Sequence, residues 1–355
     1  MTSFARLPLA AIVAAWALAS SASTAANAFD ACSVKPASSL VVNVRDRGAK
    51  GDGKTNDTAA IQRAINEVAG TGGTVFIPKG VYMVQAVGKS LKLGSKMTLR
   101  LADKATLKVI PNGEKRYYTL RIHEASDVTV MGGTLLGDRK EHKEKEGEWG
   151  MGIHIVRSSR ITIAGVTSTR MWGDGFYVVD GTDIAFCSVA AVNNRRQGLS
   201  IISANRLLVT DSVFRDTRGT RPSAGIDMEP NKPSQKITNV RIERSKFINN
   251  AGDGILVAGH KAVVAKVEIR NNLFDGNDQP ILVENARRVR SRDICDNRVV
   301  SRHKQPAAGL NAYAEAVQVA SPQMDCRGGS DMRFERSRMT KQNKKNKKEK
   351  PKAAN

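Results

Sequence analysis

Apolar residues recur along this chain in short alternating stretches. Six stretches start with Gly or Pro and place two apolar side chains on one face of an extended segment: Gly152–Ile155, Gly175–Val178, Gly198–Ile201, Gly225–Met228, Gly254–Val257 and Pro280–Val283. Their first residues are 23, 23, 27, 29 and 26 positions apart, and further apolar stretches such as Ile161–Ile163 lie between them. Period-two strands that return every twenty-odd residues predict a β-solenoid, in which each coil buries its inward side chains against its neighbours. We expect regular coils over residues 148–300.

Residues 41–84 differ from this repeat because they contain one helical pattern. Asp57 is the expected N-cap of a helix over residues 57–69, which Gly72 and Gly73 end. The apolar residues of this helix have the spacing of one helix face: Ile61, Ala64, Ile65 and Val68. Short strands are expected on both sides of it: Val41–Val44, Thr74–Ile77 and Val81–Val84. A single helix ahead of a strand-rich chain predicts a cap on the open end of the stack.

The segment from Gly48 to Val84, GAKGDGKTNDTAAIQRAINEVAGTGGTVFIPKGVYMV, closely resembles the N-terminal signature of the pectate-lyase superfamily. More narrowly, it resembles the rhamnogalacturonase/epimerase-like group, a signature that phage tailspike depolymerases share. The resemblance implies an all-β, right-handed parallel β-helix with an N-terminal capping helix, and work on carbohydrate. It is specific for the fold and does not select a reaction.

The two ends of the chain lack the pattern of the repeat. An early arginine, the apolar run Leu7–Ala19 and small residues ending at Ala28 have the order of a signal peptide. The run is too short to span a bilayer, although a membrane anchor is the alternative interpretation. We therefore expect cleavage near Ala28, a secreted or periplasmic protein, and a β-helix over residues 29–332. The segment 333–355 has ten Lys or Arg and two Glu, and we expect this Lys-rich tail to be disordered.

The net charge narrows the class of partner. The chain carries +22, of which the tail accounts for +8 and the signal segment for +1, so that +13 remains on the folded part. Nucleic acid, anionic lipid and acidic polysaccharide are all attracted by such a charge. Export favours the acidic polysaccharide, and we expect neither nucleic-acid binding nor stable membrane insertion.

Four cysteines in an exported chain permit three complete pairings. They are Cys32, Cys187, Cys295 and Cys326. We favour a bridge between Cys295 and Cys326, because they are closest in sequence and both lie near the C-terminal end. No Cys-x-x-Cys or His-x-x-x-His spacing occurs, which argues against a zinc site.

Stacked coils bring equivalent positions to about 4.8 Å from one another, so that residues distant in sequence form columns on the surface. The outward position two residues after the start of each stretch gives one such column: His154, Tyr177, Ser200, Asp227, Leu256 and Leu282. Its polar and aromatic members concentrate in the middle coils. Because a random surface rarely aligns acids, Arg, His, Tyr and Trp, this concentration predicts a site.

We assign two groups of candidate residues to this surface. The candidates for chemistry are Asp174, Tyr177, Arg195, Arg196, Asp227 and Glu229. The candidates for contacts with the sugar are Trp149, His154, Trp172, Ser200 and Asp253. We expect the two tryptophans to stack in adjacent coils. The acids in Gly-Asp-Gly turns and the arginines also have an ordinary structural interpretation, as turn and solvated surface residues.

The resemblance allows a comparison with the polygalacturonase-type hydrolases of this fold, which stack Asn-Thr-Asp, Asp-Asp and Gly-His-Gly on successive coils. Asp174 matches the first Asp, but Arg196 and Gln197 occupy the Asp-Asp level and Ala224 stands where the His belongs. A hydrolase with Asp174 paired to Asp227 or Glu229 would therefore have a rearranged site.

We consequently favour β-elimination or epimerisation of a uronate. In that reaction Arg195 or Arg196 neutralises the carboxylate, and Tyr177 or His154 carries the proton. A hydrolase and a non-catalytic glycan-binding or structural β-helix are the alternatives. The one cofactor that the sequence suggests is Ca²⁺, which hard carboxylate oxygens prefer to bind. Its ligands would be Asp174, Asp227 and Glu229.

Overall fold

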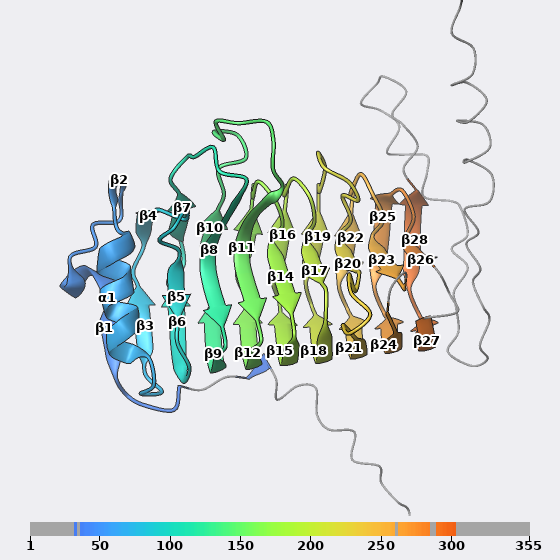
Figure 1. Cartoon of the computed structure of the whole chain (residues 1–355), viewed down its shortest axis with the longest axis horizontal. Coiled ribbons are helices and arrows are strands. Elements are labelled where there is room, and N and C mark those ends of the chain that lie inside the picture. Colours follow the sequence, from blue (N-terminus) through green and yellow to red (C-terminus); the bar gives the residue numbers. More distant parts are fainter. Residues whose placement is uncertain (1–31, 34–35, 260–261, 285–288, 303–355) are drawn as a thin grey trace, which may run out of the picture.

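The alternating stretches form strands that coil into three parallel β-sheets (Figure 1). The structure is a computed structural model that describes residues 32–33, 36–259, 262–284 and 289–302. Each regular coil contributes one strand to each sheet, and each strand pairs in parallel with its counterparts in the coils before and after it. The predicted all-β parallel β-helix is confirmed. Coils also precede residue 148, since strands from Leu91 onward already belong to the same three sheets.

Sheets A and B each contain ten strands, and sheet C contains eight. Sheet A consists of β1 (Val41–Asn43), β3 (Thr74–Ile77), β6 (Met97–Leu101), β9 (Ser126–Met131), β12 (Ser159–Ala164), β15 (Gly181–Cys187), β18 (Ala204–Thr210), β21 (Ile237–Glu243), β24 (Val264–Arg270) and β27 (Val289–Cys295). Sheet B consists of β2 (Asp52–Asn56), β4 (Gly80–Val84), β7 (Ala105–Val109), β10 (Thr134–Leu136), β13 (Thr167–Thr169), β16 (Ala190–Val192), β19 (Val213–Arg215), β22 (Lys246–Ile248), β25 (Leu273–Asn277) and β28 (Arg298–Arg302). Sheet C consists of β5 (Leu91–Leu93), β8 (Arg116–His123), β11 (Trp149–Val156), β14 (Phe176–Val179), β17 (Leu199–Ile201), β20 (Ile226–Met228), β23 (Ile255–Ala258) and β26 (Ile281–Glu284).

Inward side chains of all three sheets form one continuous core along the axis of the helix. The rings of Phe214, Phe247 and Phe274 stack in consecutive coils at centroid distances of 5.3 and 4.9 Å. The glycine that begins five of the six stretches is explained by close approach of the backbone, because a Cβ on Gly175 would lie 2.7 Å from the carbonyl oxygen of Gly198. The hydrophobic effect therefore fixes the register of the coils, and with it the columns on the outer surface.

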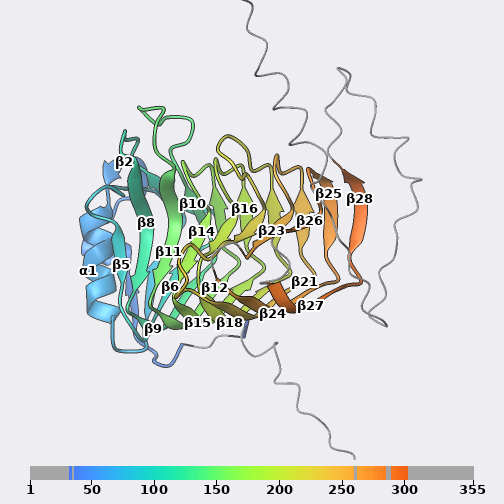
Figure 2. The same ribbon diagram turned by 45° about the vertical axis from the view of Figure 1, so that its right-hand side comes forward.

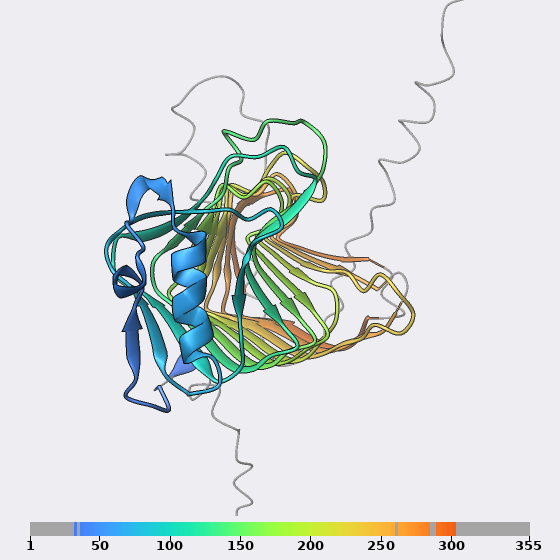
Figure 3. The same cartoon turned by 60° about the vertical axis from the view of Figure 1, so that its left-hand side comes forward.

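The predicted cap is present as helix α1 (Thr58–Val68), which covers the open end of the stack (Figure 3). Its buried side packs on the core through residues that include Ile61, Ile65 and Val68. The N-cap prediction was right in position but wrong in chemistry. Asp57 makes no side-chain hydrogen bond to the helix, and its carboxylate instead accepts from the backbone N–H groups of Lys50 and Gly51, at 2.6 and 3.0 Å. A 3₁₀ turn, η2 (Val44–Arg47), precedes this loop.

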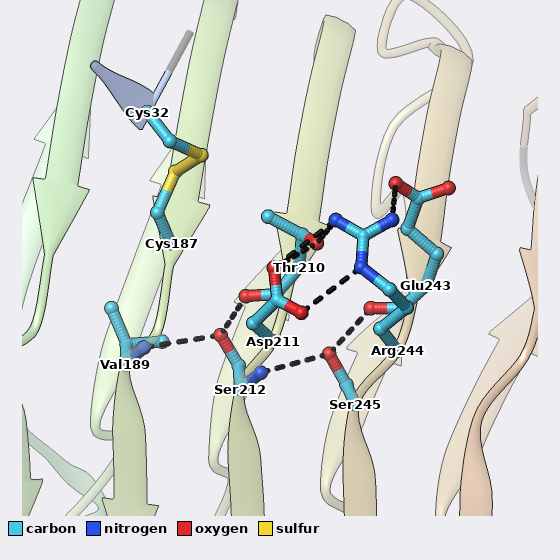
Figure 4. Close-up of a disulfide and its surroundings, with 9 residues drawn as sticks. All are labelled: Cys32, Cys187, Val189, Thr210, Asp211, Ser212, Glu243, Arg244 and Ser245. Atoms are coloured by element: carbon cyan, nitrogen blue, oxygen red, sulfur yellow. Dashed lines mark hydrogen bonds and ion pairs between the residues drawn. A yellow bond between two sulfur atoms is a disulfide. The ribbon is translucent and has the colours of Figure 1, made fainter. Parts of the chain in front are cut away.

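A disulfide joins Cys32 to Cys187, which ends β15, and it connects two positions separated by 155 in the sequence (Figure 4). It fastens the segment ahead of the cap to a coil in the middle of the helix. The favoured partner of Cys295, Cys326, lies outside the described residues, so that this bridge remains a prediction compatible with the first. The segments 1–28 and 333–355 also lie outside the described residues. In the described part of the chain, no helix has the length and apolar character needed to cross a membrane.

Candidate functional site

The outer column of sheet C has the register that the repeat predicted. His154 pairs with Tyr177, Tyr177 with Ser200, and Ser200 with Asp227. The column also continues toward the cap, where Arg121 is opposite His154 and Lys92 is opposite Arg121. Six successive rungs thus change from cationic through aromatic to acidic side chains, beginning at the cap and ending at Asp227.

Asp174 and Arg196 form the centre of the polar cluster. Asp174 is fully buried and accepts hydrogen bonds from Arg196 Nη1, at 3.0 Å, and from Ser200 Oγ, at 2.9 Å. Burial raises the pKa of Asp174 to about 6, and the guanidinium of Arg196 opposes that rise. A carboxyl group with such a pKa can exchange a proton near neutral pH.

Asp227 lies beside this pair and is 1% exposed. Gln197 Nε2 donates to its Oδ2 at 2.8 Å, while its Oδ1 has no hydrogen-bond partner among the described residues. Burial, and then the charge of Glu229, raise the pKa of Asp227 well above its usual range. Because Gln197 Nε2 donates to Oδ2, a proton on Asp227 would lie on Oδ1. That oxygen has no partner among the described residues and could donate the proton to a bound molecule.

The aromatic rungs form a second cluster toward the cap. The ring of His154 stacks on Tyr118 at 4.1 Å and contacts Tyr177 at 5.2 Å between centroids. His154 Nδ1 lies 2.7 Å from Nε2 of His123, whose own Nδ1 receives a bond from Arg121 Nη2 at 2.9 Å. Burial, together with neighbouring positive charge, lowers the pKa of His154 to about 3. Burial and the charge of Asp174 raise the pKa of Tyr177 to about 12. At neutral pH the imidazole is therefore uncharged and the phenol keeps its proton.

Several predicted site residues are less accessible than the sequence suggested. Asp174, Ser200 and Asp227 point away from the core of the coil, yet neighbouring side chains and loops cover them, and Asp253 is only 3% exposed. The prediction of an open surface was therefore wrong for Ser200 and Asp227, whereas His154 and Tyr177 in the same column are partly exposed. Outward direction on a strand does not mean contact with water where long connections rise over the coil.

The two tryptophans and Arg195 have structural partners. Trp172 does not stack on Trp149; its ring lies between His142, at 4.0 Å, and the guanidinium of Arg195, at 3.9 Å. Arg116 covers the ring of Trp149 at 4.6 Å. Because Arg195 also donates to the carbonyl oxygen of Gly147 at 2.7 Å, it holds the 137–148 loop and does not belong to the Asp174 centre.

The calcium hypothesis is not supported by the geometry. Within the described ranges, no three His, Cys, Asp or Glu side chains converge in a way that would hold a metal ion. The charges of Glu229 and Asp174 both act on Asp227 and help to raise its pKa, but Asp174 is already paired with Arg196. A cation would have to displace that guanidinium.

Sequence reasoning missed the coil of Tyr118, Arg121 and His123 because its stretch has Thr119 where the others have Gly or Pro. The alternation of Leu120 and Ile122 was the available signal. Lys92 was missed for the same reason, and in the structure it lines an open hollow with Lys89 and Gln62. The role of Gln197 depends on contacts between coils that a single sequence does not display.

The N-terminal part of the chain matches a known family model. Residues 41–99 match the model described as rhamnogalacturonase A/epimerase, pectate lyase-like. The matched residues form the cap and the first coils of a continuous parallel β-helix. The fold of this segment is therefore the one that its sequence signature implied. The fold is a parallel β-helix, and its N-terminal part is similar to the pectate-lyase-like family.

Longer comparisons extend this likeness without fixing a reaction. The chain is 27% identical over 266 residues to the uncharacterized protein YclG of Bacillus subtilis, a match that covers 62% of the chain and 45% of YclG. The chain thus spans less than half the length of the first curated relatives that it matches.

Two solved structures show the shared fold. The Family 28 exopolygalacturonase of Yersinia enterocolitica superposes with a TM-score of 0.55 at 14% identity, over 76% of this chain and 67% of that one. The surface adhesin PfbA of Streptococcus pneumoniae superposes with a TM-score of 0.54 at 17% identity, over 74% and 79% of the two chains. One of these proteins is named for action on a polysaccharide and the other for adhesion, so the function has to be argued from the site.

Proposed function

We propose that this protein is exported and acts on an acidic, uronate-containing polysaccharide along the outer face of sheet C, by β-elimination or epimerisation. The observation that carries the proposal is the order of side chains in one column. Lys92 and Arg121 supply positive charge, His154 and Tyr177 supply groups that exchange protons, and Asp227 ends the series. A chain of uronates that lies along the accessible rungs of this column, from Lys92 to Tyr177, meets cations and proton-transfer groups on adjacent rungs.

β-Elimination and epimerisation share their first step, removal of the proton at C5 of the uronate while a cation stabilises the charge on its carboxylate. His154 is uncharged at neutral pH and is suited to accept that proton. Its low pKa reflects burial and the charges of His123 and Arg121, and a bound carboxylate that neutralises those charges would raise it.

Tyr177 is suited to the opposite role, because its raised pKa keeps the phenol protonated. In elimination it donates its proton to the oxygen that leaves C4 of the sugar. In epimerisation a proton instead returns to C5 from the other face. Since His154 and Tyr177 are neighbours on paired strands, one sugar ring can contact both.

A hydrolase is the second candidate, and one specific observation favours it. Asp174 and Asp227 are both buried carboxyl groups with raised pKa values. Glycoside hydrolysis requires one carboxyl that gives a proton and one carboxylate that serves as base or nucleophile. We place hydrolysis second because both groups are covered, whereas His154 and Tyr177 are partly exposed.

Product analysis tests the proposal. The protein is incubated with polygalacturonate, alginate and a neutral polysaccharide, and the products are followed by ultraviolet absorbance, reducing-end assay and NMR. Unsaturated ends show elimination, and changed configuration at C5 without cleavage shows epimerisation; Tyr177→Phe should lower the elimination rate by about 100-fold or more. New reducing ends without ultraviolet absorbance would replace the proposal by hydrolysis. Binding with no product would replace it by a glycan-binding role.

A further inference from the structure

The loop of residues 137–148 joins β10 to β11 and is coloured green in Figure 2, and its last residue reaches Arg196 of the Asp174–Arg196 centre. Its last residue, Glu148, places Oε2 3.6 Å from Nε of Arg196. That Nε is buried and has no hydrogen-bond partner within the described structure. A buried guanidinium N–H without a hydrogen-bond partner costs free energy of folding. A ligand that places a hydrogen-bond acceptor in front of Arg196 Nε would remove that cost.

The two carboxylates that face Arg196 are held very differently. Asp174 is fully buried and binds Arg196 Nη1 at 3.0 Å, with Ser200 on the same oxygen. The Glu148 side chain is 33% exposed, and its distance from Nε is too long for a hydrogen bond. Water can therefore solvate the carboxylate of Glu148 in place of Arg196 at little cost in free energy. Asp174 is too deeply buried for water to do the same.

The loop is positioned so that Glu148 can move while its neighbours stay in place. Arg195 Nη1 donates to the carbonyl oxygen of Gly147 at 2.7 Å, and Trp172 Nε1 donates to that of Glu146 at 3.3 Å. These bonds fix the backbone immediately before Glu148. A rotation of the Glu148 side chain therefore uncovers Arg196 Nε without any displacement of the loop.

We propose that the Nε face of Arg196 is the binding position for a uronate carboxylate, and that Glu148 occupies this position when no substrate is bound. A substrate carboxylate free to approach can form the short charge-assisted bond of about 2.7–2.9 Å that Glu148 does not reach. The position then selects a free uronate over its methyl ester, because the ester has no charge to exchange with that of Glu148. This inference rests on the proposed function for the class of its ligand.

The test is Glu148→Gln, with Glu146→Gln as the matched control. Both variants remove one negative charge from the same loop, but Glu146 pairs with Lys115 and its side chain is 78% exposed, away from Arg196. Titration calorimetry measures the Kd of each protein for a trigalacturonate, an oligomannuronate and the methyl ester of the trigalacturonate. We expect Glu148→Gln to tighten binding of at least one free acid by about two- to fivefold, the range of a partly exposed ion pair. Binding of the ester, and the Kd values of Glu146→Gln, should stay within error of the unaltered protein.

Three results would overturn the inference. Equal tightening in both variants would mean that the loop acts only through its overall charge. Unchanged or weaker binding in Glu148→Gln, in a protein that still converts polygalacturonate or alginate, would refute the role of Glu148 and leave the proposed function standing. If neither the unaltered protein nor Glu148→Gln binds or converts any uronate, both the inference and the proposed function fail.

Discussion

Two faces of the helix both carry pairs of Arg and Asp side chains, but the pairs differ in their exposure to solvent. On sheet A, ion pairs link successive coils in the open: Arg160 binds Asp127 at 2.6 Å and Arg206 binds Asp183 at 2.5 Å, with both arginine side chains more than half exposed. A similar pair, Arg244 with Asp211, follows β21 and β18 and also engages Thr210 (Figure 4). Beside sheet C, Asp174 is fully buried and the side chain of its partner Arg196 is only 14% exposed.

The difference shows where charge indicates chemistry. An exposed ion pair gains roughly 0–1 kcal/mol and tolerates change, so that a row of them is a modest structural ladder. A buried pair has to overcome desolvation of both ions, and a well-packed apolar pair would often be as stable. The presence of Asp174, Arg196 and Asp227 in one covered cluster is therefore better explained by function than by stability.

The largest effect, and one that separates the two candidate reactions, is expected from Asp227→Asn. The amide keeps the shape of the side chain and removes its proton. If the carboxyl pair of the second candidate, hydrolysis, converts the polysaccharide identified by product analysis, turnover should fall by about 100-fold or more, whereas conversion by His154 and Tyr177 should change little. The melting temperature should change little, because a buried group with a raised pKa does not need its charge for stability. Asp183→Asn on sheet A is the control and should keep full activity. A Tm loss of many degrees with retained activity would make Asp227 a structural residue.

Arg196→Ala should produce the largest loss of stability. It leaves Asp174 buried without its cation, and breaking a buried pair in this way costs about 3–5 kcal/mol. Urea unfolding measures the change in the free energy of unfolding. The double variant Asp174→Asn/Arg196→Ala should recover most of the loss, since no buried charge then remains. Equal stability of Arg196→Ala and the unaltered protein would show that water reaches Asp174 freely.

The pH dependence of stability should have opposite signs on the two faces. A raised pKa means that folded Asp174 binds its proton more tightly than the unfolded chain does, so its contribution to stability falls as pH rises from about 4 to about 6. The stability of Asp174→Asn relative to the unaltered protein should therefore rise by roughly 2–3 kcal/mol over that interval. Arg206 lowers the pKa of Asp183, whose contribution is instead lost as pH falls through the acid range. Unfolding curves at intervals of about one pH unit from about pH 2 to about pH 7 test both signs, because Asp183 loses its contribution below about pH 4.

The smallest effect is expected from the exposed ladder itself. Arg206→Ala should lower the free energy of unfolding by less than about 1 kcal/mol, and added salt should reduce even that difference. Urea unfolding at low and high salt is the measurement. A loss as large as that of Arg196→Ala would remove the contrast between the two faces.

Much of this molecule could be predicted from the chain alone. The spacing of Gly152, Gly175 and Gly198 was sufficient to predict the coils, and the register places His154 opposite Tyr177 as the columns required. Arg196, Tyr177 and Asp227 were correctly brought near one another. Arg195 and Trp172 were wrongly grouped with them, because their partners come from the 137–148 loop, whose path has no periodicity.

The sequence by itself determined the architecture, because alternation, spacing and the buried glycines act locally and repeat in every coil. It also determined which residues share a column, since a fixed register follows from the buried face. Only the tertiary structure decided that Asp174 and Asp227 are buried, that Cys32 pairs with Cys187, and that Glu148 faces Arg196. Burial and pairing depend on the path of irregular connections between coils. That path is set by contacts among residues far apart in the chain, which no local pattern records.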